Sequence, residues 1–426
     1  MIGYVIVIVL LGLLAVMALL DATRGTPVDR VTARGTGHPP GVEDASFLPT
    51  IETYTGTTLQ QGHDLQLMTC GDDTYPGLWA DIRAAKRFVA VQMYYFKEGE
   101  VANQFRDALV ERARAGVAVL FLYDAFGSKV SREYKRALTS AGVEIAPFRP
   151  LRIQLLHTIK HRAHSRAIVI DGEIGYTGGF GIDDKWLGDG RHHGQWRDTN
   201  VRLQGPAVTQ LMGAFASCWA EATGELMTGP VCFPADVPKA GNPPALAAVV
   251  HAMPTVGSTP AERLVALSLA AARRTLYITN PYFVPDDDVR RFLRDAARRG
   301  VDVRILTVGE ESDVKSTLYA ARARYKHLLE AGVRIYEYQA AMIHAKTILV
   351  DGVWGMVGTI NTDNRSMAFN NEVSLVAMDA TFGDALTRMF MKDIEYAKEI
   401  RLETFLRRPL WQRPLEQGAH LMSRIL

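Results

Sequence analysis

The sequence has little of several features that mark particular classes of protein. Its three cysteines, Cys70, Cys218 and Cys232, lie at no metal-ligand spacing, and an odd number gives no disulfide framework. Lys and Arg number 48 against 46 Asp and Glu, a net charge of +2. Dedicated nucleic-acid-binding proteins usually carry a larger positive excess, so no nucleic-acid partner is expected. No carboxylate-rich metal cluster stands out either, so no metal site is expected.

Long apolar runs are also missing, except at the N-terminus. Residues 1–20, MIGYVIVIVLLGLLAVMALL, contain no charge, and about 20 apolar residues span a bilayer core. A cleaved signal peptide is the alternative, but it normally begins with basic residues and has a shorter apolar stretch. We therefore expect a single transmembrane anchor in the cell membrane. Arg24, Arg30 and Arg34 follow it, so the positive-inside rule places the globular body in the cytoplasm.

The rest of the chain reads as a linker and two similar α/β halves. Residues 21–50 are rich in Gly, Pro, Thr and charge without an apolar period, which predicts a linker. Helix-like and strand-like segments then alternate, which favours a layered α/β fold. We expect a first lobe over residues 51–235 and a second over 236–426. The predicted helix–strand–helix–strand series covers 75–87, 88–96, 101–116 and 117–127, then 261–274, 275–284, 286–300 and 301–309.

One short pattern occurs in both halves. HSRAIVID at residues 164–171 and HAKTILVD at 344–351 each contain a His, a cation two residues later and an Asp five residues after that. The first copy therefore contains His164, Arg166 and Asp171, and the second contains His344, Lys346 and Asp351. The four residues before each Asp have the composition of a buried strand, and Asp-Gly then predicts a hairpin turn.

An imidazole beside a fixed cation suits phosphate chemistry. The cation holds the nonbridging oxygens, and the imidazole attacks phosphorus or passes a proton. Two copies related by a pseudo-twofold axis place two histidines on opposite sides of one phosphorus, one as nucleophile and one as general acid. For a single copy, a structural role is the stronger interpretation, because a lone His is usually a satisfied polar residue and an Asp before Gly usually serves the turn. The duplication, with matched flanks, favours function.

Four polar residues that flank the repeated pattern are candidates for orienting the two histidines or binding substrate. A carboxylate bonded to the far imidazole nitrogen fixes the tautomer and raises basicity. An ordinary role as acids at strand ends remains open for the two carboxylates of this group. The candidates are Asp198, Asn361, Asn370 and Glu372.

These motifs resemble the phospholipase D superfamily, and more closely its bacterial cardiolipin synthase branch. The resemblance covers about residues 64–426 and includes ITNPYFVPDDDV, WRDTNVRLQGPAV and VGTINTDNRSMAFNNEVSL. It implies two phospholipase D-type lobes, each a mixed sheet flanked by helices, which share one active site without metal or organic cofactor. It also implies a covalent phosphohistidine, with His164 as nucleophile and His344 as general acid, although the near-symmetry permits the reverse.

Three residues depart from the family pattern: Arg166 replaces a Lys, Gly181 an Asn and Gln92 a Glu. Arg keeps the charge, but its planar fork differs in geometry from an ammonium. The resemblance implies a membrane-bound phosphatidyltransferase that moves a phosphatidyl group from phosphatidylglycerol to a second phospholipid. The alternatives are a phosphodiester hydrolase that uses water and a degenerate, non-catalytic lipid-binding homologue. The sequence does not indicate the oligomeric state.

Overall fold

The fold was analysed in a computed structural model. The structure describes residues 4–5, 8–9, 12–14, 16, 28–35, 37–150, 161–255, 257–409, 415–416 and 418–419. Most of residues 1–20, on which the expected membrane anchor falls, lie outside the described residues. Among the described residues, no helix combines the length and the apolar character needed to cross a membrane.

The first half of the chain forms strands and helices in alternation. They follow the helix α2 (Phe47–Thr55), and the 3-10 helix η2 (Asp184–Trp186) lies among them. The elements are β1 (Gln60–Met68), α3 (Gly71–Ala84), β2 (Phe88–Met93), β3 (Phe96–Lys97), α4 (Glu100–Arg114), β4 (Ala118–Asp124), β5 (Ser128–Lys129), α5 (Arg132–Thr139), β6 (Glu144–Phe148), β7 (Ala167–Ile170), β8 (Ile174–Gly178), β9 (Trp196–Arg197), β10 (Asn200–Gln204) and α6 (Ala207–Thr223).

The second half repeats the order with a few additions. Its elements are β11 (Ala245–Ala252), α7 (Pro260–Ala271), β12 (Thr275–Thr279), α8 (Asp287–Arg298), β13 (Asp302–Val308), α9 (Lys315–Glu330), β14 (Arg334–Tyr338), β15 (Met342–Ile343), β16 (Thr347–Val350), β17 (Trp354–Gly358), α10 (Asn364–Ala368), β18 (Glu372–Met378), α11 (Ala380–Ile394), β19 (Ala397–Ile400) and α12 (Leu402–Leu406).

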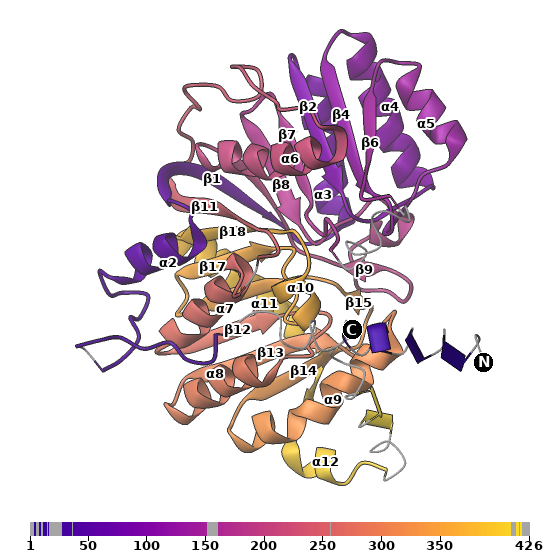
Figure 1. The fold of residues 1–426 in the computed structure, drawn as a ribbon. Coiled ribbons are helices and arrows are strands. Elements are labelled where there is room, and N and C mark those ends of the chain that lie inside the picture. Colours follow the sequence, from indigo (N-terminus) through magenta and orange to yellow (C-terminus); the bar gives the residue numbers. More distant parts are fainter. Residues whose placement is uncertain are drawn as a thin grey trace.

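The strands of both halves join in one mixed sheet, and their order shows the internal repeat. From one edge the order is β6-β4-β2-β7-β8-β10-β1, and it continues as β11-β18-β17-β16-β12-β13-β14-β19. Apart from the added β19, the second series is the first in reverse, so the antiparallel β1–β11 pair lies at the centre. Figure 1 shows the two lobes on either side of this pair. This arrangement is the two-lobed α/β fold expected from the sequence.

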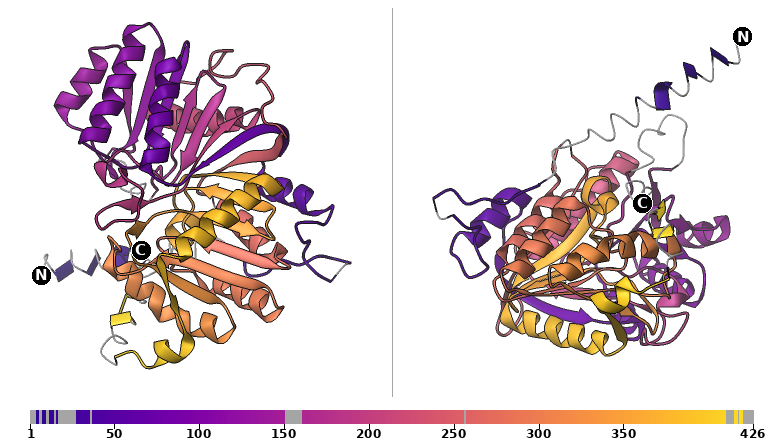
Figure 2. Two further views of the ribbon diagram at one scale, coloured as in Figure 1. Left: turned by 180° about the vertical axis from the view of Figure 1, so that it is seen from behind. Right: turned by 90° about the horizontal axis from the view of Figure 1, so that it is seen from below.

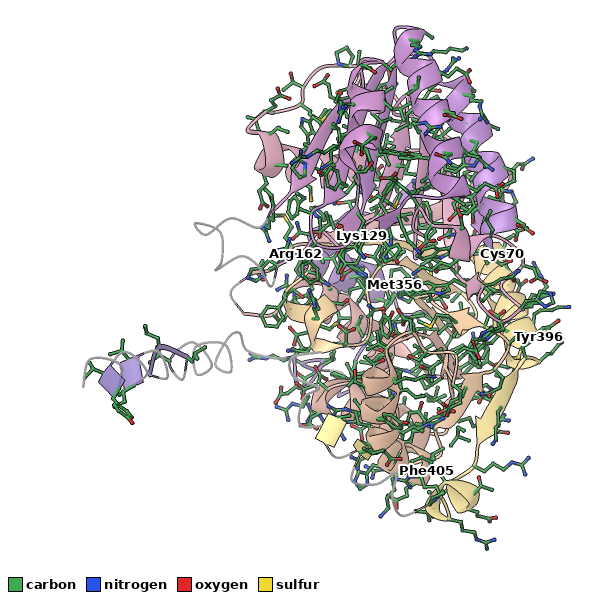
Figure 3. The ribbon with its side chains drawn as sticks, turned by 90° about the vertical axis from the view of Figure 1, so that its right-hand side faces the viewer. Cys70, Lys129, Arg162, Met356, Tyr396 and Phe405 are labelled. Carbon is green, nitrogen blue, oxygen red and sulfur yellow. The ribbon has the colours of Figure 1, made fainter. Side chains whose placement is uncertain are left out.

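Helices cover both faces of the sheet. In the second lobe α7, α8 and α9 lie on the face turned to the viewer in Figure 1, and α11 lies on the opposite face (Figure 2). Parallel strands such as β2 are buried on both faces, which explains the continuous apolar run FVAVQM. One hydrophobic cluster contains both Phe215 of α6 and Leu386 of α11, so the core continues from one lobe into the other. Figure 3 shows the side chains of both lobes, with Arg162 labelled near their boundary.

Helix capping explains several element boundaries. The Asp286 carboxylate accepts hydrogen bonds from the main-chain N–H groups of Asp288 and Val289, and α8 begins directly after Asp286. The Asp363 carboxylate likewise accepts from the N–H of Ser366 at the start of α10. This cap fixes the loop between β17 and β18, which contributes to the site described below.

The linker predicted over residues 21–50 ends earlier than expected. Helix α2 begins at Phe47, because Phe47 and Ile51 are fully buried against the second lobe. The Phe47 ring packs edge-on against Trp354 with ring centroids 5.1 Å apart. Burial of two apolar side chains on one helical face outweighs the polar composition of the preceding residues.

Candidate active site

The two repeated segments meet where the lobes join. Strand β9 of the first lobe pairs in parallel with β15 of the second, with Trp196 opposite Met342. The main-chain N–H of His344 donates to the carbonyl of Arg197 at 2.6 Å. On the other side an isolated bridge joins Ala163 to Asn371. These main-chain contacts bring each histidine beside the opposite lobe.

Each histidine is bonded to a carboxylate of the other lobe. His164 Nδ1 lies 3.0 and 2.9 Å from the two carboxylate oxygens of Glu372, which is 208 residues away in the chain. His344 Nδ1 lies 2.8 Å from Asp198, 146 residues away. The two pairs therefore cross between the lobes, and all four side chains are buried.

Both carboxylates are held by further donors. Glu372 also accepts from the Thr359 hydroxyl and from Asn370 Nδ2 at 3.2 Å. Asp198 accepts from the indole N–H of Trp186 at 2.9 Å and from the main-chain N–H of Thr199 at 2.8 Å. A carboxylate fixed in this way accepts a hydrogen bond from the Nδ1–H of its histidine, so Nε2 is the nitrogen that carries the lone pair.

A cationic side chain contacts each imidazole. Arg166 donates from Nε to the carbonyl of Phe180 at 2.9 Å, and one terminal nitrogen lies 3.2 Å from His164 Nε2. Lys346 Nζ lies 2.8 Å from His344 Nε2. Both cations are almost completely buried. The two half-sites thus contain the same arrangement of acid, imidazole and cation, and Arg166 fills the position of the Lys.

Burial controls the protonation of the site. Desolvation, opposed by Glu372, lowers the pKa of His164 to about 4, and Arg166 lowers it further. Desolvation and the neighbouring Lys346 hold the pKa of His344 well below its usual value. Burial also lowers the pKa of Lys346 to about 7. Both imidazoles are therefore neutral near pH 7, which is the nucleophilic form.

The carboxylate partner of His344 is ionised. Burial alone raises the pKa of Asp198, but interactions with His344, Lys346 and the Trp186 indole outweigh it and leave the pKa below its usual value. The ionised Asp198 accepts the Nδ1 proton of the neutral His344 and so fixes its tautomer.

Both histidines face one cavity of about 340 Å³. Its wall combines polar side chains around the two histidines with several aromatic rings. The lining residues are Tyr94, Tyr95, His164, Arg166, Trp186, Trp196, Tyr282, Val284, Asp313, Val314, Thr317, His344, Asn361, Asp363, Arg365, Ser366 and Asn370. A cavity of this size holds a phosphodiester and its headgroup but not acyl chains, which have to leave through its mouth.

The structure does not bring Asp171 and Asp351 to the cavity, so their predicted catalytic role is corrected to a structural one. Both have left-handed backbone (φ 54° and 52°) in the predicted Asp-Gly hairpin turns after β7 and β16. The Asp171 carboxylate accepts from the main-chain N–H groups of Lys86, Arg87 and Phe88 at 2.8 Å each. The Asp351 carboxylate likewise accepts from three main-chain N–H groups at the start of β12. Each Asp therefore fastens a hairpin to the start of the neighbouring strand.

The predicted orienting residues all reach the site. Asp198 and Glu372 bind the histidines, Asn370 binds Glu372, and Asn361 lines the cavity. Within the described ranges, the Oδ1 atoms of Asn361 and Asn370 and the Ser366 hydroxyl are buried without a hydrogen-bond partner. Unpaired buried acceptors are costly, so these atoms are suited to bind substrate hydroxyl groups. Gln92 is buried on β2 and does not line the cavity.

Sequence reasoning missed the aromatic wall and Asp363. The aromatic residues lie in loops or in elements of two or three residues, where no periodicity marks them, and only their places in WRDT and NPYFVPDD gave a signal. Desolvation raises the pKa of Asp363 to about 7. Within the described part of the chain, no group of three or more His, Cys, Asp and Glu side chains is arranged to hold a metal ion.

Comparison with known proteins places this geometry in a family. The family model described as "Cardiolipin synthase, PLD-like domain" matches residues 78–219 and 266–394. The chain is 36% identical over 363 residues to a protein named cardiolipin synthase from Geobacillus kaustophilus, covering 84% of this chain and 72% of that one. It is 34% identical over 365 residues to cardiolipin synthase 2 from Bacillus anthracis, covering 85% and 71%.

A solved structure shows the same fold at low identity. The phosphatidylserine synthase of Haemophilus influenzae superposes with a TM-score of 0.66 at 13% identity, and the match covers 89% of this chain and all of that one. The identities and the extent of the family match confirm the resemblance seen in the repeated motif, and the chain belongs to the cardiolipin synthase family of phospholipase D-like phosphatidyltransferases.

Proposed function

We propose that this chain moves a phosphatidyl group from phosphatidylglycerol to a hydroxyl group of a second phospholipid, through a phosphohistidine on His164. The observation that supports this most directly is the crossed arrangement of two acid–imidazole–cation sets on one cavity. Each set contains a neutral imidazole with a fixed tautomer, and both face the same enclosed space.

In the first step the Nε2 lone pair of His164 attacks phosphorus, and the bond from phosphorus to the headgroup oxygen breaks. Glu372 stabilises the positive charge that develops on His164, as its hydrogen bond to Nδ1 requires. Arg166 and Lys346 face the nonbridging oxygens, where negative charge increases. The departing headgroup oxygen takes a proton from His344, and glycerol leaves.

His344 takes up this proton from solvent when the substrate binds. In the empty site burial and Lys346 keep His344 neutral, but an anionic phosphodiester beside the ring favours its protonated form and raises its pKa. In the second step an acceptor hydroxyl gives its proton back to His344 and attacks the phosphohistidine. The bond from phosphorus to His164 breaks, and the free imidazole is restored.

The intact geometry around Arg166 supports a working enzyme over a degenerate homologue. The guanidinium keeps the contact with His164 that Lys346 makes with His344. The Nε atom of this longer side chain donates to the Phe180 carbonyl. Gly181 follows Phe180, and a Cβ there would lie 2.9 Å from the Trp186 ring, so the Gly leaves that indole in place beside Asp198.

We also propose the finer features of organisation. Residues 1–20 form a membrane anchor, because they are uncharged and long enough to span a bilayer. The globular body then lies at the cytoplasmic face. The lobes divide near residues 235 and 236, since the interval between the end of α6 at Thr223 and the start of β11 at Ala245 separates the two repeats.

A lipid product assay tests the reaction. Purified full-length protein receives phosphatidylglycerol in mixed micelles with EDTA, and the products are identified by mass spectrometry. Cardiolipin and glycerol are expected, with loss of both products in His164→Ala and His344→Ala. His327→Ala on α9 is the control, because that histidine is exposed and lies outside the cavity.

Two outcomes would contradict the proposal. Phosphatidic acid without cardiolipin would make the chain a hydrolase with water as acceptor. Equal product from the wild type and both active-site variants would show that the crossed pairs do no chemistry. A peptide carrying the phosphatidyl group on His164, trapped by rapid denaturation at alkaline pH where the phosphorus–nitrogen bond survives, would identify the nucleophile directly, and the same adduct on His344 would reverse the assignment.

A further inference from the structure

Three aromatic rings of the cavity wall surround a lysine from the same chain. The Lys185 Nζ lies 3.5 Å from the ring centroid of Trp196, 3.9 Å from that of Tyr95 and 5.0 Å from that of Trp186. The rings also pack on one another, with the two indoles 4.7 Å apart and Tyr95 5.6 Å from Trp186. We call Tyr95, Trp186 and Trp196 the aromatic cage.

The rings provide most of the surroundings of this ammonium group. Within the described residues its one ion pair is with Asp183, at the long distance of 4.0 Å. The side chain is 20% exposed. Burial lowers the pKa of Lys185 to about 8, so the group is mainly charged at neutral pH. A cation within about 6 Å of an aromatic face is attracted by the ring quadrupole, and three faces around one cation form a strong site of this type.

Aromatic cages of this kind bind quaternary ammonium ligands in other proteins. Here all three rings line the catalytic cavity, but the chain's own lysine fills the space between them. The cage is therefore both occupied and positively charged, and an incoming ammonium group meets repulsion where it would otherwise find a site.

The cage lies on the side where a headgroup departs. The Trp196 ring is 4.8 Å from the His344 ring and the Trp186 ring is 5.8 Å from it. In the proposed function His344 protonates the departing headgroup oxygen, so the headgroup passes beside these rings. This step rests on the proposed function; the occupied cage itself does not.

We propose that Lys185 fills the aromatic cage and thereby excludes lipids with ammonium headgroups, such as choline or ethanolamine lipids, in favour of uncharged polyol headgroups. Lys185 is a specificity-determining residue in this account. Its removal uncovers a binding site for a quaternary ammonium group beside His344.

Tetramethylammonium binding tests the cage without any lipid chemistry. The full-length protein in detergent is titrated with tetramethylammonium chloride against a sodium chloride control, and tryptophan fluorescence reports on Trp186 and Trp196. Lys185→Ala is expected to bind at least about tenfold more tightly than the wild type, the order expected for a desolvated cation–aromatic contact. Lys185→Ser is a second truncation, and thermal melting checks that both variants fold.

Two controls separate occupation from a general change in charge. Lys185→Met removes the charge but still fills the cage, so it is expected to bind no more tightly than the wild type. Lys97→Met removes an exposed lysine of β3 outside the cage and is expected to bind like the wild type. Folded truncation variants that bind no better than the wild type would overturn the proposal, and so would Lys185→Met binding as tightly as Lys185→Ala.

A lipid competition gives the second readout. Phosphatidylglycerol and phosphatidylcholine are offered together, and the ratio of product from each donor is measured. Lys185→Ala is expected to raise the share from phosphatidylcholine at least about tenfold, in line with its gain in ammonium affinity. An unchanged ratio in a variant that binds tetramethylammonium would refute the role in specificity. A wild type without product from phosphatidylglycerol would refute the proposed function and leave the binding result standing.

Discussion

The buried ammonium of Lys346 makes a specific prediction about pH. Its pKa of about 7 arises from burial and the nearby Arg166, opposed by Asp198. As pH rises through this value, Lys346 loses the charge that faces the phosphate oxygens. About half of Lys346 is charged at pH 7 and about one part in a hundred at pH 9, so we expect kcat/KM, which reports the free enzyme, to lose roughly 50-fold over this range. This alkaline limb comes on top of the slope that proton uptake by His344 gives to every variant, so it is read from the ratio to Lys346→Arg. The acidic limb lies near pH 4, where His164 becomes protonated and loses its nucleophilic lone pair.

The substitution Lys346→Arg removes this alkaline limb. Arg keeps its charge to a pH of about 12, and Arg166 shows that the site accepts a guanidinium at the equivalent position. We expect a lower absolute rate, because the larger fork shifts the contact with His344, but no such additional loss of kcat/KM from pH 7 to pH 9. The assay is the initial rate with a short-chain phosphatidylglycerol over pH 4 to 10.

Asp363 is the rival source of the same limb. Burial raises its pKa to about 7, so it gains a negative charge in the cavity over the same pH range. Asp363→Asn keeps an N-cap acceptor for α10 and removes that titration. We expect the alkaline limb to persist in Asp363→Asn. A limb that disappears in this variant, or that persists in Lys346→Arg, would refute the assignment to Lys346.

Three further predictions follow from the site. Arg166→Lys leaves the Phe180 carbonyl without its donor, so we expect lower turnover and a loss of about 1–3 kcal/mol of unfolding free energy, measured by urea denaturation. Asp351→Ala removes the acceptor for several main-chain N–H groups, and we expect a loss of about 2–5 kcal/mol with little change in the KM of the folded fraction; a kcat as low as that of His344→Ala would contradict this structural role. Lys346→Met abolishes activity but stabilises the fold at pH 6 by up to roughly 5 kcal/mol, the cost of lowering a pKa from 10.5 to about 7. The substitution is stabilising because the folded wild type holds Lys346 at a lowered pKa. Between pH 7 and pH 10.5 the folded state therefore binds fewer protons than the unfolded state, so the unfolding free energy of the wild type should rise across that range.

Local signals in the sequence were sufficient for the lobes and the hairpins. Apolar runs and Asp-Gly turns predicted β7–β8 and β16–β17, because these features act within a few residues. The role of Asp171 was not predicted correctly, since the N–H groups that donate to its carboxylate belong to residues 86–88, more than 80 positions earlier. A turn residue and a catalytic residue have the same appearance in a short motif.

The pairing of acids with histidines also required the tertiary structure. Asp198 and Glu372 were both candidates, but the sequence did not indicate that each serves the histidine of the other half. That result depends on how the central β1–β11 pair and the β9–β15 contact join the lobes. The aromatic cage was missed for the same reason, because its rings come from a loop, a 3-10 turn and a two-residue strand, at Tyr95, Trp186 and Trp196, that share no periodic pattern.

The crossing of the two acid–histidine pairs also affects the order in which activity appears during synthesis. The first lobe leaves the ribosome with His164 and Arg166 in place but before Glu372 has been translated. During that interval His164 lacks the partner that sets its tautomer, and Asp198 has no histidine to bind. A chain that stops early, or loses its second half to a protease, therefore carries one half-site without its orienting carboxylate.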